Sequence, residues 1–558
     1  TSNMFGGRLG ATIIDSLDTM YLMGLTESYK DARDWVEKEL SFNQDVSISV
    51  FEGTIRILGG LLSTFAMTKD PLYLDKAKDF ADRLLPAFKS PSAIPFSKIN
   101  LRTGMFQLAY QGYEKFAWGF DELNPLTKKA VLTSNMFGGR LGATIIDSLD
   151  TMYLMGLTES YKDARDWVEK ELSFNQDVSI SVFEGTIRIL GGLLSTFAMT
   201  KDPLYLDKAK DFADRLLPAF KSPSAIPFSK INLRTGIPSG NSWGSGSILA
   251  EFGSLHLEFV YLSHLLNDTK YAEKVYKIRN KILAADRYRD GLYGVSYDID
   301  KGMFQPVGNY YTMGAMADSF YEYLLKTWLQ SAKQDTIARK MYDRAIEGAI
   351  KHLLNISREG FYYLTSTRDG RTMEHLACFA GGLFALGAVT QGSRWSANHL
   401  EIGKQLTRTC HTAYDRSVTK LGPEVFSFVP GEEAQSASSD PKFYMLRPEV
   451  VESYFIMWRL THNPIYREWG WSVVKALQTH CMTPAGFSGI HDVYSNQSEK
   501  DGVQQTFFLA ETLKYLYLLF SNDALLDLKS WVFNTEAHPF PSLENFSVPE
   551  LIPNISRK

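Results

Sequence analysis

The residues of this chain best placed to do chemistry are carboxylates at the starts of apolar segments. Six acids share this position, namely Asp147, Glu184, Glu251, Asp318, Glu449 and Glu511. A buried carboxylate is costly unless it is paired or functional. Any single one could be a helix-start residue or an ion-pair partner. Six in a common position predict a ring of acids at the mouth of a cavity, which suits glycoside hydrolysis or the binding of a hard cation.

The elements that must position these acids are helices of two alternating kinds. Seven segments are apolar nearly all round and must be buried; they are Leu141–Leu157, Val182–Thr196, Ile248–Leu265, Met316–Trp328, His375–Ala388, Leu446–Leu460 and Phe507–Phe520. Seven amphipathic segments alternate with them, namely Phe106–Phe120, Glu159–Ser173, Leu204–Phe220, Lys270–Asp286, Asp335–Leu354, Ala397–Ser417 and Ile465–Cys481. This alternation predicts an all-α protein, an (αα)7 barrel with inner and outer helix rings.

The chain also contains an internal repeat without a single difference. Residues 1–104 are identical to residues 133–236, whereas residues 105–132 and everything after residue 236 occur once. Using the first copy would require looping out the second at a loop-closure cost. We therefore expect 105–541 to form the barrel, 542–558 to be a tail, and 1–104 to be a surplus pair of αα units that docks weakly, exchanges with the second copy or stays poorly packed.

Composition excludes several classes of protein. The formal charge is -4 and no basic stripe is present, so we expect no nucleic-acid partner. No run of 18 apolar residues occurs and the first residues lack signal-peptide features, so we expect any membrane anchor to lie upstream of Thr1. Five N-glycosylation sequons, at Asn267, Asn355, Asn496, Asn545 and Asn554, favour a lumenal protein.

Seven strings, taken in order, resemble glycoside hydrolase family 47, the class I α-1,2-mannosidases. They are GATIIDSLDTMYLMGL (142–157), FEGTIRILGGLLS (183–195), ADSFYEYL (317–324), HLACF (375–379), LRPEVVES (446–453), FFLAETLKYL (507–516) and FNTEAH (533–538). The resemblance implies a Ca²⁺-dependent mannosyl-oligosaccharide 1,2-α-mannosidase. Its expected reaction is inverting hydrolysis of terminal α-1,2-linked mannose from high-mannose N-glycans on glycoproteins.

The resemblance also implies a role for each matching residue. Glu184 corresponds to the general acid, and Asp318 and Glu449 to the other catalytic carboxylates, Glu449 being favoured as the base. Thr535 corresponds to the residue that binds calcium directly, and Glu452, Glu511 and Glu536 to acids that hold it through water. The positions implied for substrate binding are Arg188, Glu251, His375, Arg447, Phe507 and Glu511, and Cys378 and Cys410 match a disulfide.

The sequence departs from the family pattern in two places. One bears on the cellular location of the protein, and the other on the first outer helix of the barrel. Met316 stands where endoplasmic-reticulum members carry Arg, and the stretches 426–434 and 462–471 also resemble the Golgi subgroup. We therefore expect a monomer on the lumenal side of the Golgi membrane, with the endoplasmic-reticulum lumen as the alternative. The duplicate replaces the start of the family's first helix, which predicts a helix that is shortened or built partly from Ile99–Gly104.

Three alternatives stay open at this point. A lectin-like relative that recognises glycans with little turnover would carry the same acids. Other α-toroid enzymes are disfavoured, because a terpene cyclase needs a DDxxD-type motif and a zinc-dependent cyclase needs Cys and His ligands that the spacing does not supply. A chain from a faulty gene assembly, folded only in part, is the third.

Overall fold

The structure is a computed structural model. It describes residues 9–543 except 45, 90–97, 101–102, 133–136, 138–139, 241–245, 286–288, 306–309, 369 and 392–395. The predicted tail, 542–558, therefore lies outside the described residues from 544 onward, as do the sequons at Asn545 and Asn554.

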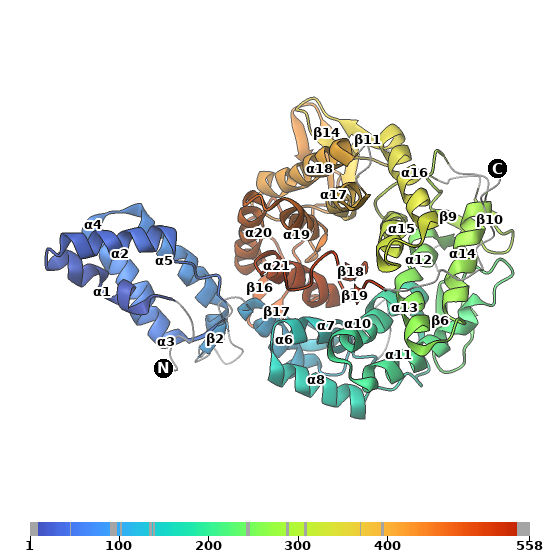
Figure 1. Cartoon of the computed structure of the whole chain (residues 1–558), viewed down its shortest axis with the longest axis horizontal. Coiled ribbons are helices and arrows are strands. Elements are labelled where there is room, and N and C mark those ends of the chain that lie inside the picture. The colour runs from blue at the N-terminus through green and yellow to red at the C-terminus, as the bar shows by residue number, and fades with distance from the viewer. Residues whose placement is uncertain are drawn as a thin grey trace.

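Two concentric sets of helices form the ring on the right of Figure 1. The inner set is α7 (Ala143–Leu154), η3–α10 (Gly185–Thr200), α12–α13 (Leu249–Leu266), α15 (Asp318–Gln330), η5–α17 (His375–Gln391), α19 (Glu449–Thr461) and η7–α21 (Phe508–Leu519). The outer set is α6 (Gly104–Ala117), α8 (Thr158–Lys170), α11 (Pro203–Leu216), α14 (Ala272–Ala284), α16 (Thr336–His352), α18 (Ser396–Arg416) and α20 (Ile465–Ala476). The predicted all-α (αα)7 barrel is confirmed.

A hairpin closes the centre of the ring. Strand β18 (Trp531–Phe533) pairs antiparallel with β19 (Pro539–Pro541), and Figure 1 shows the pair inside the circle of inner helices. The close approach depends on two glycines of α10. A Cβ on Gly191 would lie 2.7 Å from the Asn534 side chain, and one on Gly192 would lie 3.3 Å from the ring of His538. Small residues at these positions therefore let the hairpin pack against the inner wall.

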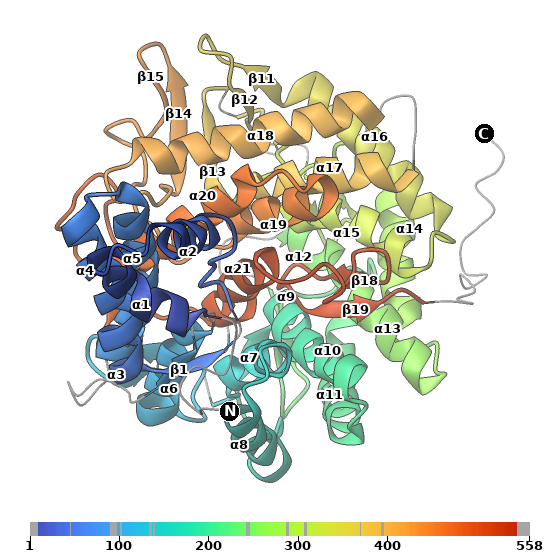
Figure 2. The same cartoon turned by 60° about the vertical axis from the view of Figure 1, so that its left-hand side comes forward.

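The described part of residues 1–104 forms a separate lobe beside the ring (Figures 1 and 2). Helices α1 (Ala11–Leu22), α2 (Thr26–Lys38), α4 (Gly59–Thr68) and α5 (Pro71–Leu84) repeat α7, α8, α10 and α11 at the same register. The lobe has a small hydrophobic core of its own, distinct from that of the ring. Few side chains join the two: Asn43 donates to the Phe520 carbonyl at 3.2 Å, Gln478 donates to the Asp82 carbonyl at 3.1 Å, and Arg83 stacks on Trp471.

The start of the barrel settles one alternative left by the sequence. Strand β2 (Lys98–Asn100) pairs with β1 (Ser47–Ser49) in the lobe, and α6 begins only at Gly104. The first outer helix therefore takes only Gly104 from the stretch Ile99–Gly104, whereas Ile99 belongs to a strand of the lobe.

The repeated apolar helix combines the length and the apolar character of a membrane span in both of its copies. Within the described chain, Val50–Thr68 and Val182–Thr200 are each 19 residues long and apolar enough to cross a membrane by length and composition. The second is mostly buried inside the ring, as a core helix must be. The first, in the lobe, is mostly not buried.

Candidate active site

One cavity of about 340 Å³ gathers nearly every residue that the sequence singled out. It is lined by Glu184, Arg188, Glu251, Met316, Asp318, Arg447, Glu449, Glu452, Phe507, Glu511, Thr535 and Glu536, among others. These side chains come from five of the seven inner segments, either from the helix itself or from the residues just before it, and from the central hairpin. The predicted convergence of acids at a cavity is thus what the structure shows. His375 does not line the cavity but lies directly behind Glu449.

Arg188 joins the candidate acid to the hairpin. Its Nε donates to Glu184 Oε2 at 2.7 Å, and its Nη1 pairs with Glu536. Arg188 belongs to a stretch in which the helix widens to π geometry, Gly185–Leu190, and Glu184 directly precedes this stretch as the last residue of α9 (Val182–Glu184). Single π turns inside α-helices frequently occur at functional sites because they re-aim side chains. The guanidinium also lies 5.6 Å from the ring centroid of Phe507, a cation–π distance.

Asp147 is the one member of the predicted acid ring that does not face the cavity. It is fully buried, and its Oδ1 lies 3.0 Å from Nε2 of His538. Asp147 lies in the second turn of α7 rather than the first, so its side chain packs against the hairpin instead of the mouth. Asp150, one turn further on, completes this buried cluster by contacting both His538 (2.7 Å) and Lys514 (2.9 Å).

The turn between β18 and β19 is held from several sides, and it carries Thr535. Asn534 Oδ1 accepts hydrogen bonds from the backbone N–H groups of Glu536 and His538 at 2.9 and 2.8 Å. The Asn534 amide donates to the Ile187 carbonyl at 2.9 Å and to Glu258 at 2.8 Å. Lys514 donates to the Ala537 carbonyl at 2.8 Å. Such a supported turn presents Thr535 and Glu536 to the cavity in a defined orientation.

Glu449, the candidate base, is kept ionised by its neighbours. Burial raises the pKa of Glu449, but the hydrogen bond and charge of His375, together with the charge of Arg447, outweigh it and leave the pKa below its ordinary value. His375 Nδ1 lies 2.9 Å from Glu449 Oε2, and its Nε2 lies 2.7 Å from the Tyr414 hydroxyl. Sequence reasoning missed Tyr414, since a tyrosine on an outer helix carries no signal of its own.

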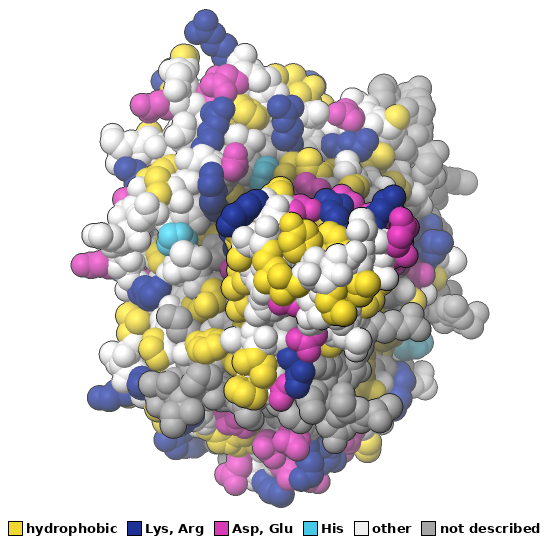
Figure 3. All heavy atoms as spheres, turned by 90° about the vertical axis from the view of Figure 1, so that its left-hand side faces the viewer, with side chains coloured by type: hydrophobic (Ala, Val, Ile, Leu, Met, Phe, Trp, Pro, Cys, Tyr) yellow, Lys and Arg dark blue, Asp and Glu magenta, His cyan; other side chains and the backbone are white. Residues whose placement is uncertain are grey.

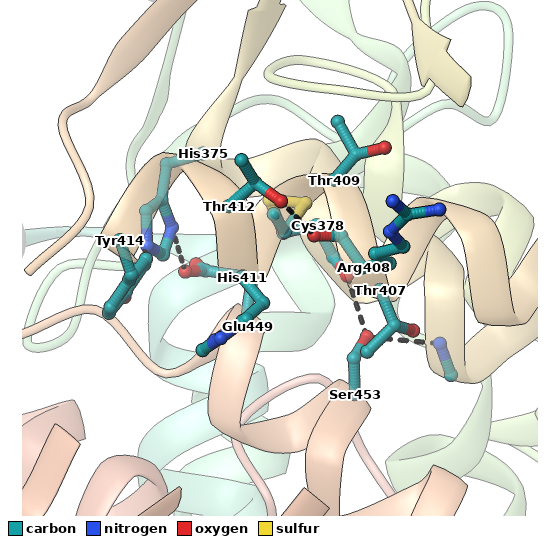
Figure 4. The surroundings of a disulfide bond; sticks show 12 residues. His375, Cys378, Thr407, Arg408, Thr409, His411, Thr412, Tyr414, Glu449 and Ser453 are labelled. Atoms are coloured by element: carbon teal, nitrogen blue, oxygen red, sulfur yellow. Dashed lines mark hydrogen bonds and ion pairs between the residues drawn. A yellow bond between two sulfur atoms is a disulfide. The ribbon is translucent and has the colours of Figure 1, made fainter. Parts of the chain in front are cut away.

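The disulfide holds the elements that carry this group of side chains (Figure 4). Cys378, three residues after His375, is bonded to Cys410 of α18, which confirms the predicted pair. Ser453 of α19 donates to the Cys378 carbonyl at 2.6 Å. The disulfide and this hydrogen bond therefore tie the segment of His375 to the helices that carry Tyr414 and Glu449.

Asp318 has an environment opposite to that of Glu449. Burial raises the pKa of Asp318 to about 7, and the charges of Glu322, Glu449 and Glu374 add to the rise. The backbone before it is strained: Met316 has φ 75°, a left-handed conformation that is uncommon for a side chain of this size. Leu446, just before Arg447, has φ 68°. Strained positions of this kind cluster at active sites.

A second group of acids, Glu452, Glu511 and Glu536, lines the cavity around the turn that carries Thr535. Burial raises the pKa of Glu452 to about 8, although Lys326 opposes it, and the charges of Glu322 and Glu449 add to the rise. Burial and the charge of Glu449 also raise the pKa of Glu511. Within the described residues, no three His, Cys, Asp or Glu side chains come close enough to hold a metal ion directly. Thr535, Glu452, Glu511 and Glu536, the residues that the family resemblance implies for calcium, all line the same cavity.

Several supporting residues were not anticipated from the sequence. Glu424 pairs with both Nε and Nη2 of Arg447, at 2.5 and 2.6 Å, and Glu374 accepts from the backbone N–H of Ala315 at 2.7 Å. Glu322 lines the cavity and pairs with Lys326. Glu374 precedes His375 in the chain, so its closeness to a motif was the one available signal.

An (αα)7 barrel whose cavity pairs an ionised carboxylate with a protonatable one belongs to the glycoside hydrolase class. The chain is a member of glycosyl hydrolase family 47, whose sequence profile matches residues 1–104 and 105–542.

Relatives with established names are similar over most of the chain. It is 47% identical over 443 residues to mannosyl-oligosaccharide alpha-1,2-mannosidase IA of Drosophila melanogaster, covering 78% of this chain and 66% of the relative. It is 50% identical over 440 residues to the human 1,2-alpha-mannosidase IC, covering 78% and 69%. The chain thus spans about two thirds of the length of these relatives. The solved alpha-1,2-mannosidase from Trichoderma reesei superposes with TM-score 0.72 at 28% identity, covering 79% of this chain and 98% of that one.

Proposed function

We propose that this chain hydrolyses terminal α-1,2-linked mannose residues of high-mannose N-glycans with inversion at the anomeric carbon. The observation that carries the proposal is the contrast between two carboxyls of one cavity: the pKa of Glu449 is lowered, whereas that of Asp318 is raised to about 7. Environments that separate the pKa values of neighbouring carboxyls mark acid and base roles. The relatives named above are mannosidases by name, and neither carries the name of a lectin.

In this mechanism Glu449 is the base that removes a proton from the attacking water, and His375 keeps it ionised. Glu184 is the carboxyl beside the departing glycosidic oxygen, positioned by its ion pair with Arg188 at 2.7 Å, which also favours its ionised form. Asp318, whose raised pKa lets it hold a proton near neutral pH, is the protonated carboxyl of the cavity, and Glu184 passes the proton to the departing oxygen. Phe507 and Arg447 line the cavity beside them, where they would contact the sugar.

We also propose that Ca²⁺ is bound by Thr535, with Glu452, Glu511 and Glu536 holding its water ligands. When bound, the ion would supply a contact to sugar hydroxyls and a positive charge among these acids. The crowding of buried carboxyls that share few cations supports this assignment.

The secretory pathway is the proposed location, on the lumenal side of the Golgi membrane. Support comes from the Cys378–Cys410 disulfide, since such bonds persist in oxidising compartments, and from sequon residues Asn267 and Asn496, which are exposed. Met316 at the cavity wall is the basis for preferring the Golgi over the endoplasmic reticulum. A monomer without a nucleic-acid partner remains our expectation for its assembly.

The test is to incubate the purified chain with a high-mannose oligosaccharide, with and without EDTA, and to weigh the products. Stepwise loss of hexose that EDTA stops and Ca²⁺ restores is the expected result. The Glu449→Gln and Asp318→Asn variants should lose roughly 10²–10⁴-fold in turnover, the usual contribution of a general acid or base. Binding of the glycan without any loss of hexose by the unaltered chain would contradict the proposal.

A further inference from the structure

The lobe of residues 1–104 preserves the internal interactions of its twin inside the barrel. Arg33 pairs with Asp70 at 2.7 Å in the lobe, and the equivalent pair in the barrel measures 2.6 Å. Arg56 likewise pairs with Glu52, as Arg188 pairs with Glu184. The lobe is therefore already folded in the conformation that the barrel requires of residues 133–236.

The two copies differ in the face that the barrel covers. Four pairs of equivalent residues show the difference as exposed fractions: Met23 67% and Met155 5%, Ile55 49% and Ile187 2%, Leu62 41% and Leu194 0%, Phe88 47% and Phe220 5%. Figure 3 looks onto the lobe and shows hydrophobic side chains gathered on its surface. Large apolar side chains exposed in this number on a small folded unit indicate a missing partner.

The second copy shows which parts of the chain cover the equivalent surface in the barrel. In the second copy α10 packs against α13 and β19, and α7 packs against η7. The polar groups on the face are matched as well: Asp147 meets His538, and Arg188 meets Glu536. Their twins in the lobe, Asp15 and Arg56, pair only with each other and with Glu52 among the described residues, and the side chains are about 42% and 41% exposed. The seat formed by residues 249–266 and 507–541 is thus complementary to either copy.

We propose that the lobe exchanges with residues 133–236 for this seat within one molecule. Because the two copies have the same sequence, each makes the same contacts when it occupies the seat. Which copy is bound there therefore depends on the few contacts between the lobe and the barrel and on how each copy is connected to the rest of the chain. If strand β2 is released, the fifteen residues 90–104 can span about 50 Å, compared with a radius of gyration of about 22 Å for a domain of this size. Exchange inside one chain also benefits from a high effective concentration. When the lobe occupies the seat, Glu52 takes the place of Glu184 in the reaction; this consequence rests on the proposed function.

The first arm of the test measures turnover. The Glu184→Gln variant should keep on the order of 1–10% of normal turnover, more than loss of a general acid usually leaves. That remainder should fall at least ten-fold in Glu52→Gln/Glu184→Gln. It should fall equally in Leu62→Asp/Glu184→Gln, because Leu62 is exposed in the lobe but its twin Leu194 is fully buried in the seat. Equal turnover in Glu184→Gln and both double variants would overturn the exchange.

The second arm does not depend on the proposed activity. A Leu194→Cys variant is treated with a thiol reagent, and Cys481, which is buried and unpaired, reports global opening in the same sample. Exchange predicts that residue 194 reacts at least ten-fold faster than Cys481, and that adding Leu62→Asp abolishes the difference. Equal, slow reaction of both thiols would overturn the inference. An inactive chain that still shows the labelling difference would reject the mannosidase assignment alone.

Discussion

His375 and Glu449 lie side by side, with Nδ1 of the histidine 2.9 Å from Oε2 of the glutamate. The contact comes from two different inner helices, η5 and α19, so it depends on how those helices are held together. It also lowers the pKa of the carboxyl that we assign as the base, against the effect of burial.

Replacing His375 with Gln should therefore shift the acid limb of the pH profile. Glu449 must be ionised to act, and its lowered pKa keeps it ionised into the acidic range. Without His375 the pKa rises, so kcat/KM should fall more at pH 5 than at pH 7. The Tyr414→Phe variant keeps the contact between His375 and Glu449, and it should shift the limb less. An unchanged limb in His375→Gln would mean that another group sets it.

Removing the disulfide should lower both stability and turnover. Cys378 and Cys410 are 32 positions apart, and the chain-entropy relation gives about 3–4 kcal/mol for a loop of this size. The Cys378→Ala/Cys410→Ala variant should melt several degrees lower, as followed by circular dichroism. Its kcat should also fall, since Cys378 belongs to the short helix that carries His375. Cys481→Ala is the matched control, because it removes one buried sulfur without opening a loop.

Calcium should raise the melting temperature, whether or not substrate is present. A ligand that binds the folded state at about 100 times its Kd stabilises by about 2.7 kcal/mol. Differential scanning fluorimetry over a Ca²⁺ series should show a saturating increase, with a smaller response to Mg²⁺, which prefers a tighter octahedral site. Glu511→Gln removes one proposed holder of water ligands and should weaken the response. A flat Ca²⁺ series would reject the site at Thr535.

Met316→Arg should narrow the range of mannose residues that are removed. Met316 lies at the cavity wall and is 36% exposed, so a longer charged side chain there would fill space that the glycan uses. Product masses should stop at a larger oligosaccharide than with the unaltered chain. Met316→Leu preserves the apolar character and should give the normal product series. Identical series from both variants would show that this wall does not set specificity.

Glu258→Gln should stabilise the protein above pH 7 and have little effect at pH 5. Burial raises the pKa of Glu258 to about 7, although Asn534 and Tyr323 donate hydrogen bonds to it. A carboxyl with a raised pKa favours the folded state below its unfolded pKa, and that stability is lost as pH rises through 7. A gain of roughly 1–3 kcal/mol at pH 8 is expected, read as a rise in melting temperature. An equal effect at both pH values would contradict the protonation argument.

Sequence periodicity was sufficient to predict that buried and amphipathic helices alternate, because a helix that is buried on all sides is apolar along most of its length. It could not distinguish Asp147 from Glu184, since both are acids near the start of an apolar helix. The distinction depends on helix phase and on His538, which is nearly 400 positions away. The π turns at Gly185–Leu190 and Phe508–Thr512 and the left-handed Met316 were also not predictable, because they are maintained by tertiary contacts rather than by local preference.

The central hairpin has a consequence for the order in which this chain is made. Synthesis proceeds at about 5–20 residues per second, so the roughly 300 residues between the second copy and Thr535 take on the order of 15–60 s. During that interval both copies have emerged, but β18 and β19, which complete their common seat, do not yet exist. The growing chain therefore carries two equivalent apolar faces at once, and such surfaces are the usual targets of chaperones. A chaperone that holds the earlier copy would leave the later one to enter the ring.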